Sequence, residues 1–412
     1  MKRAGIMLVA GDPSGDANAA GLVRALAVAV PAAQFQITGD AQPLTTPLAP
    51  FFFGAGGPKM AAAGVELAGD LTAHAVIGLG GLAQKLPMLR GLLRGLVRLA
   101  VERQPEVIIL VDYGGFNLRL ARAIKNYVRE RSGPFFNWQP RIVQFISPQV
   151  WASRPGRAQQ MARDYDLILS LFLFEKKWFA GRVPQLPVEF VGHTIFDRYP
   201  DRRRAEVPAS QDSQSPLVLL LPGSRQGELK RHLPVMRDAA GLIAARQPAR
   251  FKVVVPEETL AAMAGPVLAA CQPKIDLQVG GLPEALAAAT LALTKTGTIT
   301  LECAYFGVPA VAIYKTDWIT YWGGRRLVNV KYLSMPNLLA AEAIYPEFIQ
   351  GQATARNIAA AALELLGSPA RRDGIRAKLG LVIQSLGGPG AAGRAAAAIL
   401  QTMELAKRSR QT

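Results

Sequence analysis

Short apolar runs alternate with longer segments of helical periodicity along the chain. Runs that predict buried strands lie at Gly5–Ala10, Val107–Val111, Ile142–Ile146, Leu167–Leu173 and Val188–Val191 in the first half, and at Leu217–Leu221, Lys252–Val255, Leu291–Thr294 and Ala310–Ile313 in the second. Amphipathic helices are predicted between them, for example at Gly21–Val30, Arg90–Arg103 and Leu229–Arg246. Uninterrupted apolar runs are typical of strands buried on both faces, so this alternation predicts α/β architecture with parallel sheets.

Two series of strands predict two Rossmann-like domains. The segment Asp197–Ser215 is charged, polar and rich in turn residues, as a linker is. The predicted domains are therefore residues 1–200 and residues 201–412. The Ala-rich end, Asn357–Lys407, is predicted to be wholly helical, and this tail is free to pack back on the N-terminal domain. The segment Thr38–Pro50, with three prolines, is predicted to be an irregular loop insertion.

Two such domains facing each other are expected to leave a cleft lined by the carboxyl ends of both sheets, where doubly wound folds bind ligands. The first predicted strand leads into the turn Gly11–Asp16, which contains Asp12, Ser14 and Asp16. Such a turn exposes backbone N–H groups and the positive end of a helix dipole. Helix capping by Ser14 or Asp16 is an alternative explanation.

Two further side chains follow strands of the first series. Asp112 comes directly after Val107–Val111, and a carboxylate there is a candidate general base. The alternative is an N-cap for a helix predicted to begin near Asn117. His193 follows Val188–Val191 and is a candidate to reach the cleft, although a capping or core histidine fits the pattern equally well.

The second series carries candidate anion sites. Pro222-Gly223-Ser224-Arg225 follows Leu217–Leu221, and Arg225 supplies a cation suited to a diphosphate. Thr296-Gly297-Thr298 follows Leu291–Thr294, and small residues at a helix start can bind phosphate oxygens. Glu302, one turn further on, is a candidate ligand for ribose hydroxyls. Ordinary turns are the alternative at both places.

The net charge of +17, from 47 basic and 30 acidic residues, is spread over the 412 residues. Both halves should therefore attract anions, either phosphorylated ligands, nucleic acid or an acidic membrane surface, unless the charge only reflects a basic proteome. Aromatic residues make up 7% of the chain, and no basic stripe is interleaved with them, so nucleic acid is not expected as a partner. The two cysteines, Cys271 and Cys303, indicate a reducing compartment without disulfides.

No cofactor or metal is predicted. No cluster of Asp, Glu and His has metal-ligand spacing. The pair in Asp164-Tyr165-Asp166 precedes its predicted strand, whereas a metal-binding D-x-D motif of a glycosyltransferase would follow one.

Residues 86–99 predict a cationic amphipathic helix. Leucines that include Leu89 and Leu93 recur at helical spacing, and Arg90, Arg94 and Arg98 recur every four residues. Such a helix can contact anionic lipid and acyl chains, or can be an ordinary surface helix with a solvated arginine face. The longest apolar stretch, Val76–Ala100, is too interrupted by charge and proline to span a bilayer. We therefore expect a cytoplasmic chain that contacts a membrane from its cytoplasmic side.

Taken in order, a set of motifs resembles the lipid-A-disaccharide synthase family over nearly the whole chain. The motifs are Gly11–Asp16, Gly56-Gly57-Pro58-Lys59-Met60, Val111-Asp112, Phe116-Asn117-Leu118, Ser147–Ala152, Phe174-Glu175-Lys176, Phe190–Thr194, Leu221–Arg225, Gly297-Thr298 with Leu301-Glu302-Cys303, and Ser334–Leu339. The resemblance implies an inverting, metal-independent glycosyltransferase of the two-Rossmann type called GT-B. Its members join UDP-2,3-diacylglucosamine to 2,3-diacylglucosamine 1-phosphate and release UDP and the β-1,6-linked disaccharide 1-phosphate. They act as peripheral proteins on the cytoplasmic face of the inner membrane.

The resemblance also implies residue roles. Asp112 would be the general base, and the acceptor side would include Asp12, Ser14 and Asp16. The donor side would comprise Gly223, Ser224, Arg225, Thr296, Gly297, Thr298, Glu302, Asn337 and Gln350. The chain departs from the family where Asp12 replaces a usual Glu, where Gly115 replaces a second acid, and where Thr296 replaces a usual Ser.

A UDP-sugar 2-epimerase of the same fold is the alternative enzyme. Such an enzyme acts on a soluble substrate and would not need the helix at residues 86–99. The acyl chain length, the oligomeric state (a homodimer among the alternatives) and the effect of the altered loops stay open at this level.

Overall fold

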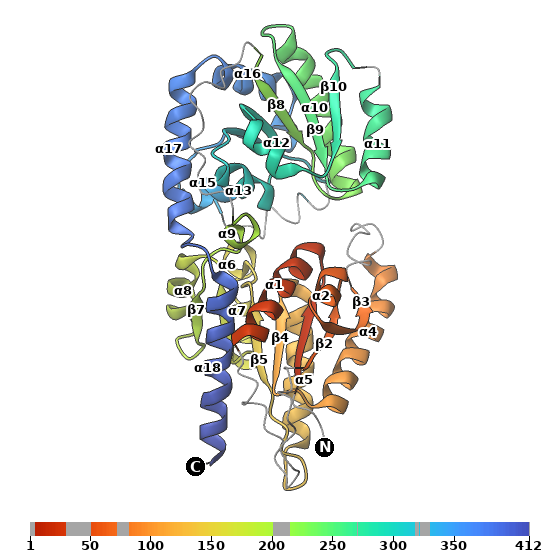
Figure 1. Cartoon of the computed structure of the whole chain (residues 1–412), viewed down its shortest axis with the longest axis vertical. Coiled ribbons are helices and arrows are strands. Elements are labelled where there is room, and N and C mark those ends of the chain that lie inside the picture. Colours follow the sequence, from red (N-terminus) through yellow and green to blue (C-terminus); the bar gives the residue numbers. More distant parts are fainter. Residues whose placement is uncertain are drawn as a thin grey trace. The chain divides into compact units, whose positions relative to one another are not determined.

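In the computed structural model of the chain, the described residues are 5–29, 51–71, 82–200, 215–269, 271–317, 321 and 330–411. They belong to two compact units, Met1–Arg198 with Leu386–Thr412, and Tyr199–Ser385. Both units are parallel-sheet α/β domains, and the chain ends in helices, as the sequence predicts (Figure 1). The predicted insertion at residues 38–50 and most of the predicted linker lie outside the described residues.

The first unit is built on a parallel sheet in the order β3-β2-β1-β4-β5-β6-β7. The strands are β1 (Gly5–Ala10), β2 (Phe51–Gly56), β3 (Val65–Asp70), β4 (Val107–Val111), β5 (Arg141–Phe145), β6 (Leu167–Ser170) and β7 (Val188–Phe190). Its helices are α1 (Pro13–Ala29), α2 (Pro58–Ala62), α4 (Leu82–Arg103), α5 (Gly114–Arg131), α6 (Val150–Ser153), α7 (Arg157–Asp164), α8 (Leu173–Ala180), α9 (Ile195–Arg198) and α18 (Ala391–Gln411). The central strands β1 and β4 are buried along their whole length, as the apolar runs predict.

Helices cover both faces of this sheet. Buried side chains of α4, α5, α7 and α8 share one core with alternate residues of the central strands, such as Met7 and Ile108. On the other face α1 lies alongside α18 (red and blue in Figure 1), and α18 also contacts β5. The last helix of the chain therefore completes the first unit.

Side chains fix α18 to the segment that follows β7. Asp197 in α9 accepts hydrogen bonds from the amides of Gly390 at 2.6 Å and Ala392 at 2.9 Å, and so caps the start of α18. The Nε of Arg394 donates to the carbonyl of Val191 at 2.7 Å. Asp197 was expected to open the linker, and its place in α9 corrects that boundary.

The second unit has a parallel sheet in the order β10-β9-β8-β11-β12-β13. The strands are β8 (Leu217–Leu221), β9 (Arg250–Val255), β10 (Ile275–Val279), β11 (Leu291–Lys295), β12 (Ala310–Tyr314) and β13 (Glu347–Ile349). The helices are α10 (Gln226–Ala244), α11 (Glu258–Leu268), α12 (Leu282–Ala288), α13 (Thr298–Tyr305), α15 (Met335–Ala340), α16 (Ala355–Leu366) and α17 (Pro369–Ser385), with a 3₁₀ turn η2 (Gln350–Gln352). Helices α10 and α16 pack together, while α13 contacts α15 and α17.

Several sequence expectations need correction. The strand predicted at Leu167–Leu173 ends at Ser170, because the Ser170 hydroxyl accepts the amide of Phe172 at 3.1 Å and turns the chain into α8. The Ala-rich end is not wholly helical. It breaks between α16 and α17 and again at residues 386–390, where Gly387 and Gly390 have positive φ. Strands β2, β3, β10 and β13 were not anticipated.

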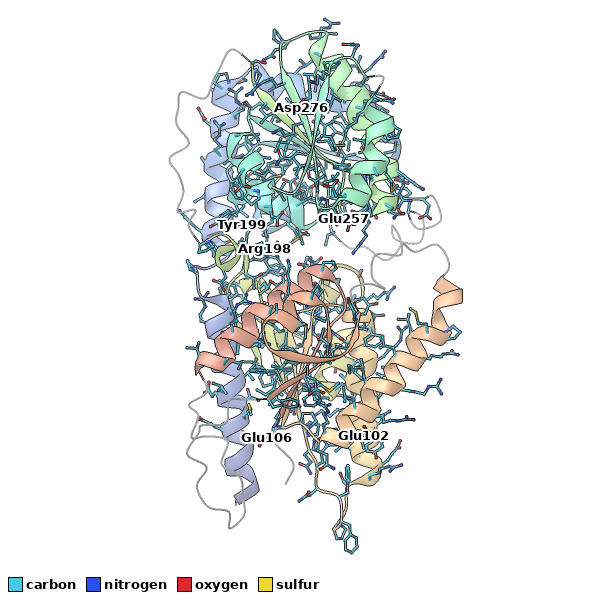
Figure 2. The ribbon with its side chains drawn as sticks, turned by 45° about the vertical axis from the view of Figure 1, so that its right-hand side comes forward. Glu102, Glu106, Arg198, Tyr199, Glu257 and Asp276 are labelled. Atoms are coloured by element: carbon cyan, nitrogen blue, oxygen red, sulfur yellow. The ribbon has the colours of Figure 1, made fainter. Side chains whose placement is uncertain are left out.

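The parallel arrangement gives each sheet one carboxyl edge. In the first unit Glu102 and Glu106 lie at the amino edge and Arg198 lies at the opposite end (Figure 2). In the second unit Glu257 follows the carboxyl end of β9, whereas Asp276 lies near the start of β10 (Figure 2). The loops that carry Asp12, Asp112, Arg225 and Thr296 follow strand ends, so the carboxyl edges are where these residues can gather.

Candidate active site

The first unit has its topological switch point between β1 and β4, where the strand order reverses direction. Ala10 and Val111 are paired in the sheet, so the loops that carry Asp12 and Asp112 leave it side by side. A Cβ atom added to Gly11 would lie 2.2 Å from the ring of Tyr113, so only glycine allows this approach. Burial and the nearby charge of Asp12 raise the pKa of Tyr113, which sequence reasoning did not single out.

The turn after β1 is shaped by its own side chain. Asp12 Oδ1 accepts the amide of Gly15 at 2.7 Å, so Asp12 caps α1, whose first residue is Pro13. Ser14 is exposed in the first turn of this helix. The residue that caps α1 is therefore Asp12, whereas the sequence suggested Ser14 or Asp16.

Asp16 is buried and its carboxylate is occupied by backbone. Oδ1 accepts the amides of Gly57 at 2.9 Å and Met60 at 3.0 Å, and Oδ2 accepts the amide of Lys59 at 3.0 Å. Asp16 therefore fixes the start of α2 against α1. The structure thus gives Asp16 a positioning role, and its acceptor-side role stays a prediction.

Asp112 directly follows β4, as predicted. Helix α5 begins at Gly114, three residues earlier than expected, and the residue before it is Tyr113. Asp112 and Tyr113 both have left-handed backbone conformation, with φ of 49° and 43°. Two consecutive non-glycine residues in this region are strained by about 1–3 kcal/mol each, and such strain is concentrated at functional sites.

A buried acid near this edge was missed by sequence reasoning. Glu175 Oε1 accepts the indole N–H of Trp151 at 2.9 Å, and Oε2 accepts the Ser170 hydroxyl at 2.6 Å. Burial raises the pKa of Glu175 to about 7, although these hydrogen bonds oppose the rise. Its place within the Phe174-Glu175-Lys176 motif was the available signal.

His193 has a local structural role. Its Nδ1 accepts the amide of Ile195 at 3.1 Å at the start of α9, and its ring lies 5.5 Å from that of Phe172. Burial, with a smaller effect of Arg198, lowers the pKa of His193 to about 3. The ring is therefore neutral at physiological pH, and the capping alternative describes it.

The second unit repeats the arrangement at its own switch point, between β8 and β11. Leu221 pairs with Thr294, so the loops Pro222–Arg225 and Thr296–Thr298 leave the sheet side by side. Gly223 and Gly297 have φ of 124° and 126°, conformations that other residues rarely adopt. These paired turns place the start of α10 beside the start of α13.

A charged cluster joins the two turns. Glu228 Oε2 accepts the amide of Ser224 at 3.1 Å, while Oε1 lies 3.2 Å from Lys295 Nζ and 3.7 Å from the guanidinium of Arg225. The Arg225 side chain is 59% exposed and Lys295 is 20% exposed, so Arg225 is the cation most open to a ligand. Lys295 and Glu228 were missed, although a lysine at the end of a buried strand was a readable signal.

His232 ties this cluster to the next strand end. Its Nε2 accepts the amide of Lys315 at 3.0 Å, so its Nδ1 carries the proton and donates to the carbonyl of Glu228 at 2.8 Å. Burial lowers the pKa of His232, which favours this neutral form. The ring therefore links α10 to the loop after β12 through these two hydrogen bonds.

The remaining donor-side candidates divide into two groups. Glu302 is half-buried on α13 and accepts the hydroxyl of Tyr199 at 3.2 Å. Asn337 is fully buried, and its amide bonds the backbone of Ile344 and Tyr345 and the carboxylate of Glu347. Gln350 Oε1 and Nε2 bond the amide and carbonyl of Thr316 at 2.8 and 3.0 Å. Asn337 and Gln350 thus hold loops in place.

The leucine side and the arginine side of helix α4 lie in different environments. Leu89, Leu92 and Leu93 are half-buried and pack on the core of the first unit, as the packed-helix alternative expects. Arg90, Arg94 and Arg98 are exposed. Contact of this helix with a membrane surface or acyl chains stays a prediction.

The described part of the chain contains neither a metal-binding cluster nor a membrane-spanning helix. Within it, no group of three or more His, Cys, Asp or Glu side chains could hold a metal ion. No helix there is long and apolar enough to cross a membrane. Asp166 of the Asp164-Tyr165-Asp166 segment pairs with Lys125 at 2.7 Å and Arg141 at 3.1 Å, as a structural ion pair does.

A family model and the sequences of related proteins both match this chain, and they point to the same family. A family model described as lipid-A-disaccharide synthetase matches residues 6–386. The lipid-A-disaccharide synthase of Anaeromyxobacter sp. (strain K) is 36% identical over 359 residues, covering 85% of this chain and 89% of that protein. The synthase of Geobacter metallireducens is 34% identical over 404 residues, covering 97% of each.

Solved structures with low sequence identity share the fold. A putative UDP-N-acetylglucosamine 2-epimerase from Listeria monocytogenes has a TM-score of 0.61 at 14% identity, over 98% of this chain and 96% of that one. The calicheamicin glycosyltransferase CalG4 has a TM-score of 0.58 at 16% identity, over 98% and 100%. Because both kinds of enzyme match equally well, the structural likeness does not separate the two enzymes that the sequence left open, and the family match does.

Proposed function

The chain belongs to the lipid-A-disaccharide synthetase family, a family of glycosyltransferases, and from this premise we propose that it joins UDP-2,3-diacylglucosamine to 2,3-diacylglucosamine 1-phosphate. The products would be UDP and the β-1,6-linked disaccharide 1-phosphate. The observation that carries the proposal is the pair of turns at the second switch point, where Arg225 and Lys295 lie beside two helix starts. Fixed cations and helix N-termini are the groups that stabilise a diphosphate.

The donor would lie at this second switch point. As the glycosidic bond to UDP breaks, negative charge grows on the β-phosphate, and Arg225 would stabilise it without a metal ion. Glu228 holds Ser224 and Lys295 in place, since it bonds one and pairs with the other. Glu302 would bind the ribose hydroxyls.

The acceptor would lie at the first switch point, beside Asp12, Ser14 and Asp112. A sugar hydroxyl is a weak nucleophile at neutral pH, so its proton must leave during attack. The Asp112 carboxylate would accept that proton while the 6-hydroxyl oxygen attacks the anomeric carbon from the face opposite UDP. A single displacement of this kind inverts the anomeric configuration from α to β.

A membrane role follows from the lipid substrates. The exposed arginines of α4 would hold the protein at the anionic cytoplasmic face of the inner membrane. The net charge of +17 adds a general attraction to that surface.

The test is incubation of the purified protein with both substrates, followed by mass spectrometry for UDP and disaccharide and by NMR for the new linkage. Formation of a β-1,6 disaccharide is expected. Epimerised UDP-sugar without disaccharide, or an α-linkage, would contradict the proposal.

A further inference from the structure

Two buried side-chain amides converge on one backbone oxygen beside the predicted base. Asn117 Nδ2 donates to the carbonyl of Asp112 at 2.8 Å, and Gln144 Nε2 donates to the same oxygen at 3.1 Å. Asn117 lies in the first turn of α5, and Gln144 lies inside β5, so the amides reach this carbonyl from two different elements. Both residues have no exposed surface. Because the acceptors are carbonyl oxygens, the orientation of both amides is fixed with nitrogen toward Asp112.

The same amides bond the neighbouring backbone as well. Gln144 Nε2 also donates to the carbonyls of Ile146 at 3.0 Å and Phe145 at 3.3 Å, and Asn117 Nδ2 donates to the carbonyl of Val111 at 3.2 Å. The amide of Asp112 in turn donates to the carbonyl of Phe145 at 2.9 Å. The ends of β4 and β5 are therefore tied into one network around the Asp112–Tyr113 turn.

This network is poorly explained as support for the fold alone. Neither Asn117 Oδ1 nor Gln144 Oε1 has a hydrogen-bond donor among the described residues, although both atoms are buried. A buried unpaired oxygen costs about 1–3 kcal/mol, and an apolar residue at 144 would continue the apolar strand without that cost. The turn that the amides hold is itself strained, since Asp112 and Tyr113 are left-handed. The unpaired oxygens and the strained turn are both unfavourable, and both occur at the end of β4. Their coincidence indicates that a functional site requires them.

We propose that Asn117 and Gln144 are positioning residues that hold the Asp112–Tyr113 turn in its left-handed conformation and so set the direction in which the Asp112 side chain leaves the backbone. The inference rests on the proposed function in one respect, that Asp112 is the base. Neither amide touches substrate. Loss of either would let the turn relax toward ordinary backbone geometry and displace the carboxylate, and a displacement of about 1 Å can cost a hundredfold in rate.

Gln144→Met tests this, because methionine has similar length and no N–H group. We expect kcat to fall about tenfold to hundredfold, with KM for both substrates within about twofold of the wild-type value. Hydrogen exchange should become at least about tenfold faster at the amides of Asp112, Phe116 and Asn117, whose bonds define the turn. Asn117→Ala should show the same two changes. Trp138→Phe is the matched control, since it removes a buried bond to the Pro105 carbonyl near the amino edge of the same sheet and should leave kcat and these amides unchanged.

Wild-type kcat and wild-type exchange at the turn in Gln144→Met would overturn the proposal. So would a loss of more than about 10 °C in Tm with faster exchange throughout the first unit, since that result would assign Gln144 to stability of the fold. If the wild-type protein forms no disaccharide, the proposed function fails, while the exchange measurement still decides whether the amides hold the turn.

Discussion

The ring of Tyr113 lies against the backbone of Gly11, so closely that a Cβ atom on Gly11 would sit 2.2 Å from it. This contact joins the loop after β1 to the loop after β4 at the point where the strand order reverses. Asp12 follows Gly11 and Asp112 precedes Tyr113. Both aspartates lie at the same edge of the sheet, because Ala10 and Val111 are paired there.

Asp112→Asn should lower kcat by at least about a hundredfold, because asparagine keeps the size of aspartate and one acceptor oxygen but cannot take up the hydroxyl proton. UDP affinity and Tm should change little. Steady-state kinetics, UDP calorimetry and thermal unfolding check the three points. A folded Asp112→Asn protein with near-normal turnover would transfer attention to Asp12.

Arg225→Ala should reduce kcat/KM for the UDP-sugar by about a hundredfold, since a charge-assisted contact to the leaving diphosphate is lost. Arg246→Ala removes the same charge from an exposed residue just beyond the other end of α10 and serves as the control. Equal kinetics for the two variants at limiting UDP-sugar would remove Arg225 from the donor site.

Chelation should leave turnover unchanged. The cations expected to stabilise the diphosphate are the side chains of Arg225 and Lys295, so the reaction is not expected to need a divalent ion. The measurement is the initial rate after dialysis against EDTA, with and without added Mg²⁺ or Mn²⁺. Activity that disappears with EDTA and returns with either ion would contradict a metal-independent mechanism.

Changing Arg90, Arg94 and Arg98 together to Glu should weaken binding of the protein to anionic vesicles at low salt. Each exposed arginine near such a surface is worth about 1 kcal/mol, and screening weakens the attraction as salt increases. Co-sedimentation with phosphatidylglycerol vesicles measures this, with neutral vesicles as the control. Equal sedimentation of variant and wild type would leave α4 as an ordinary surface helix.

Glu175→Gln should stabilise the protein at pH 8 and remove one component of its pH dependence. Burial raises the pKa of Glu175 from 4.5 to about 7, so the folded state binds a proton more tightly than the unfolded state. Protonated Glu175 contributes about 3 kcal/mol to the free energy of unfolding. This contribution is complete below pH 4.5 and is lost as the pH rises to about 7. Glutamine cannot ionise and should avoid this loss.

The contribution of His193 to stability depends on pH in the opposite sense, so the Glu175 contribution must be measured as a difference between two proteins. Its pKa is lowered to about 3, so its contribution to stability is lost as the pH falls from 6.5 toward 3. Urea unfolding of wild type and Glu175→Gln between pH 4 and 8 isolates the Glu175 component, because His193 is common to both. A constant difference in unfolding free energy across that range would contradict the assignment.

The sequence by itself determined the α/β class, the two units and most strands of both sheets. This was possible because a strand buried on both faces needs a continuous apolar run, and Val107–Val111 and Leu217–Leu221 form strands with those bounds. It also indicated which strand ends carry chemistry, since Asp112 and Arg225 directly follow such runs. The weakly apolar β3 and β10, with exposed residues along much of their length, escaped prediction because edge strands lack that run.

Only the tertiary structure decided what individual polar side chains do. Asp16 and Gln350 looked like ligand-binding residues, yet their polar atoms bond backbone from segments more than 30 residues away, and those of Asn337 bond the turn that follows its own helix. Conversely, the roles of Lys295, Glu175 and Gln144 depend on partners that the fold brings to them, such as Glu228, Trp151 and Asp112. Apolar burial is a property of one segment and can be read from its periodicity, whereas a hydrogen bond depends on where the fold brings its second atom.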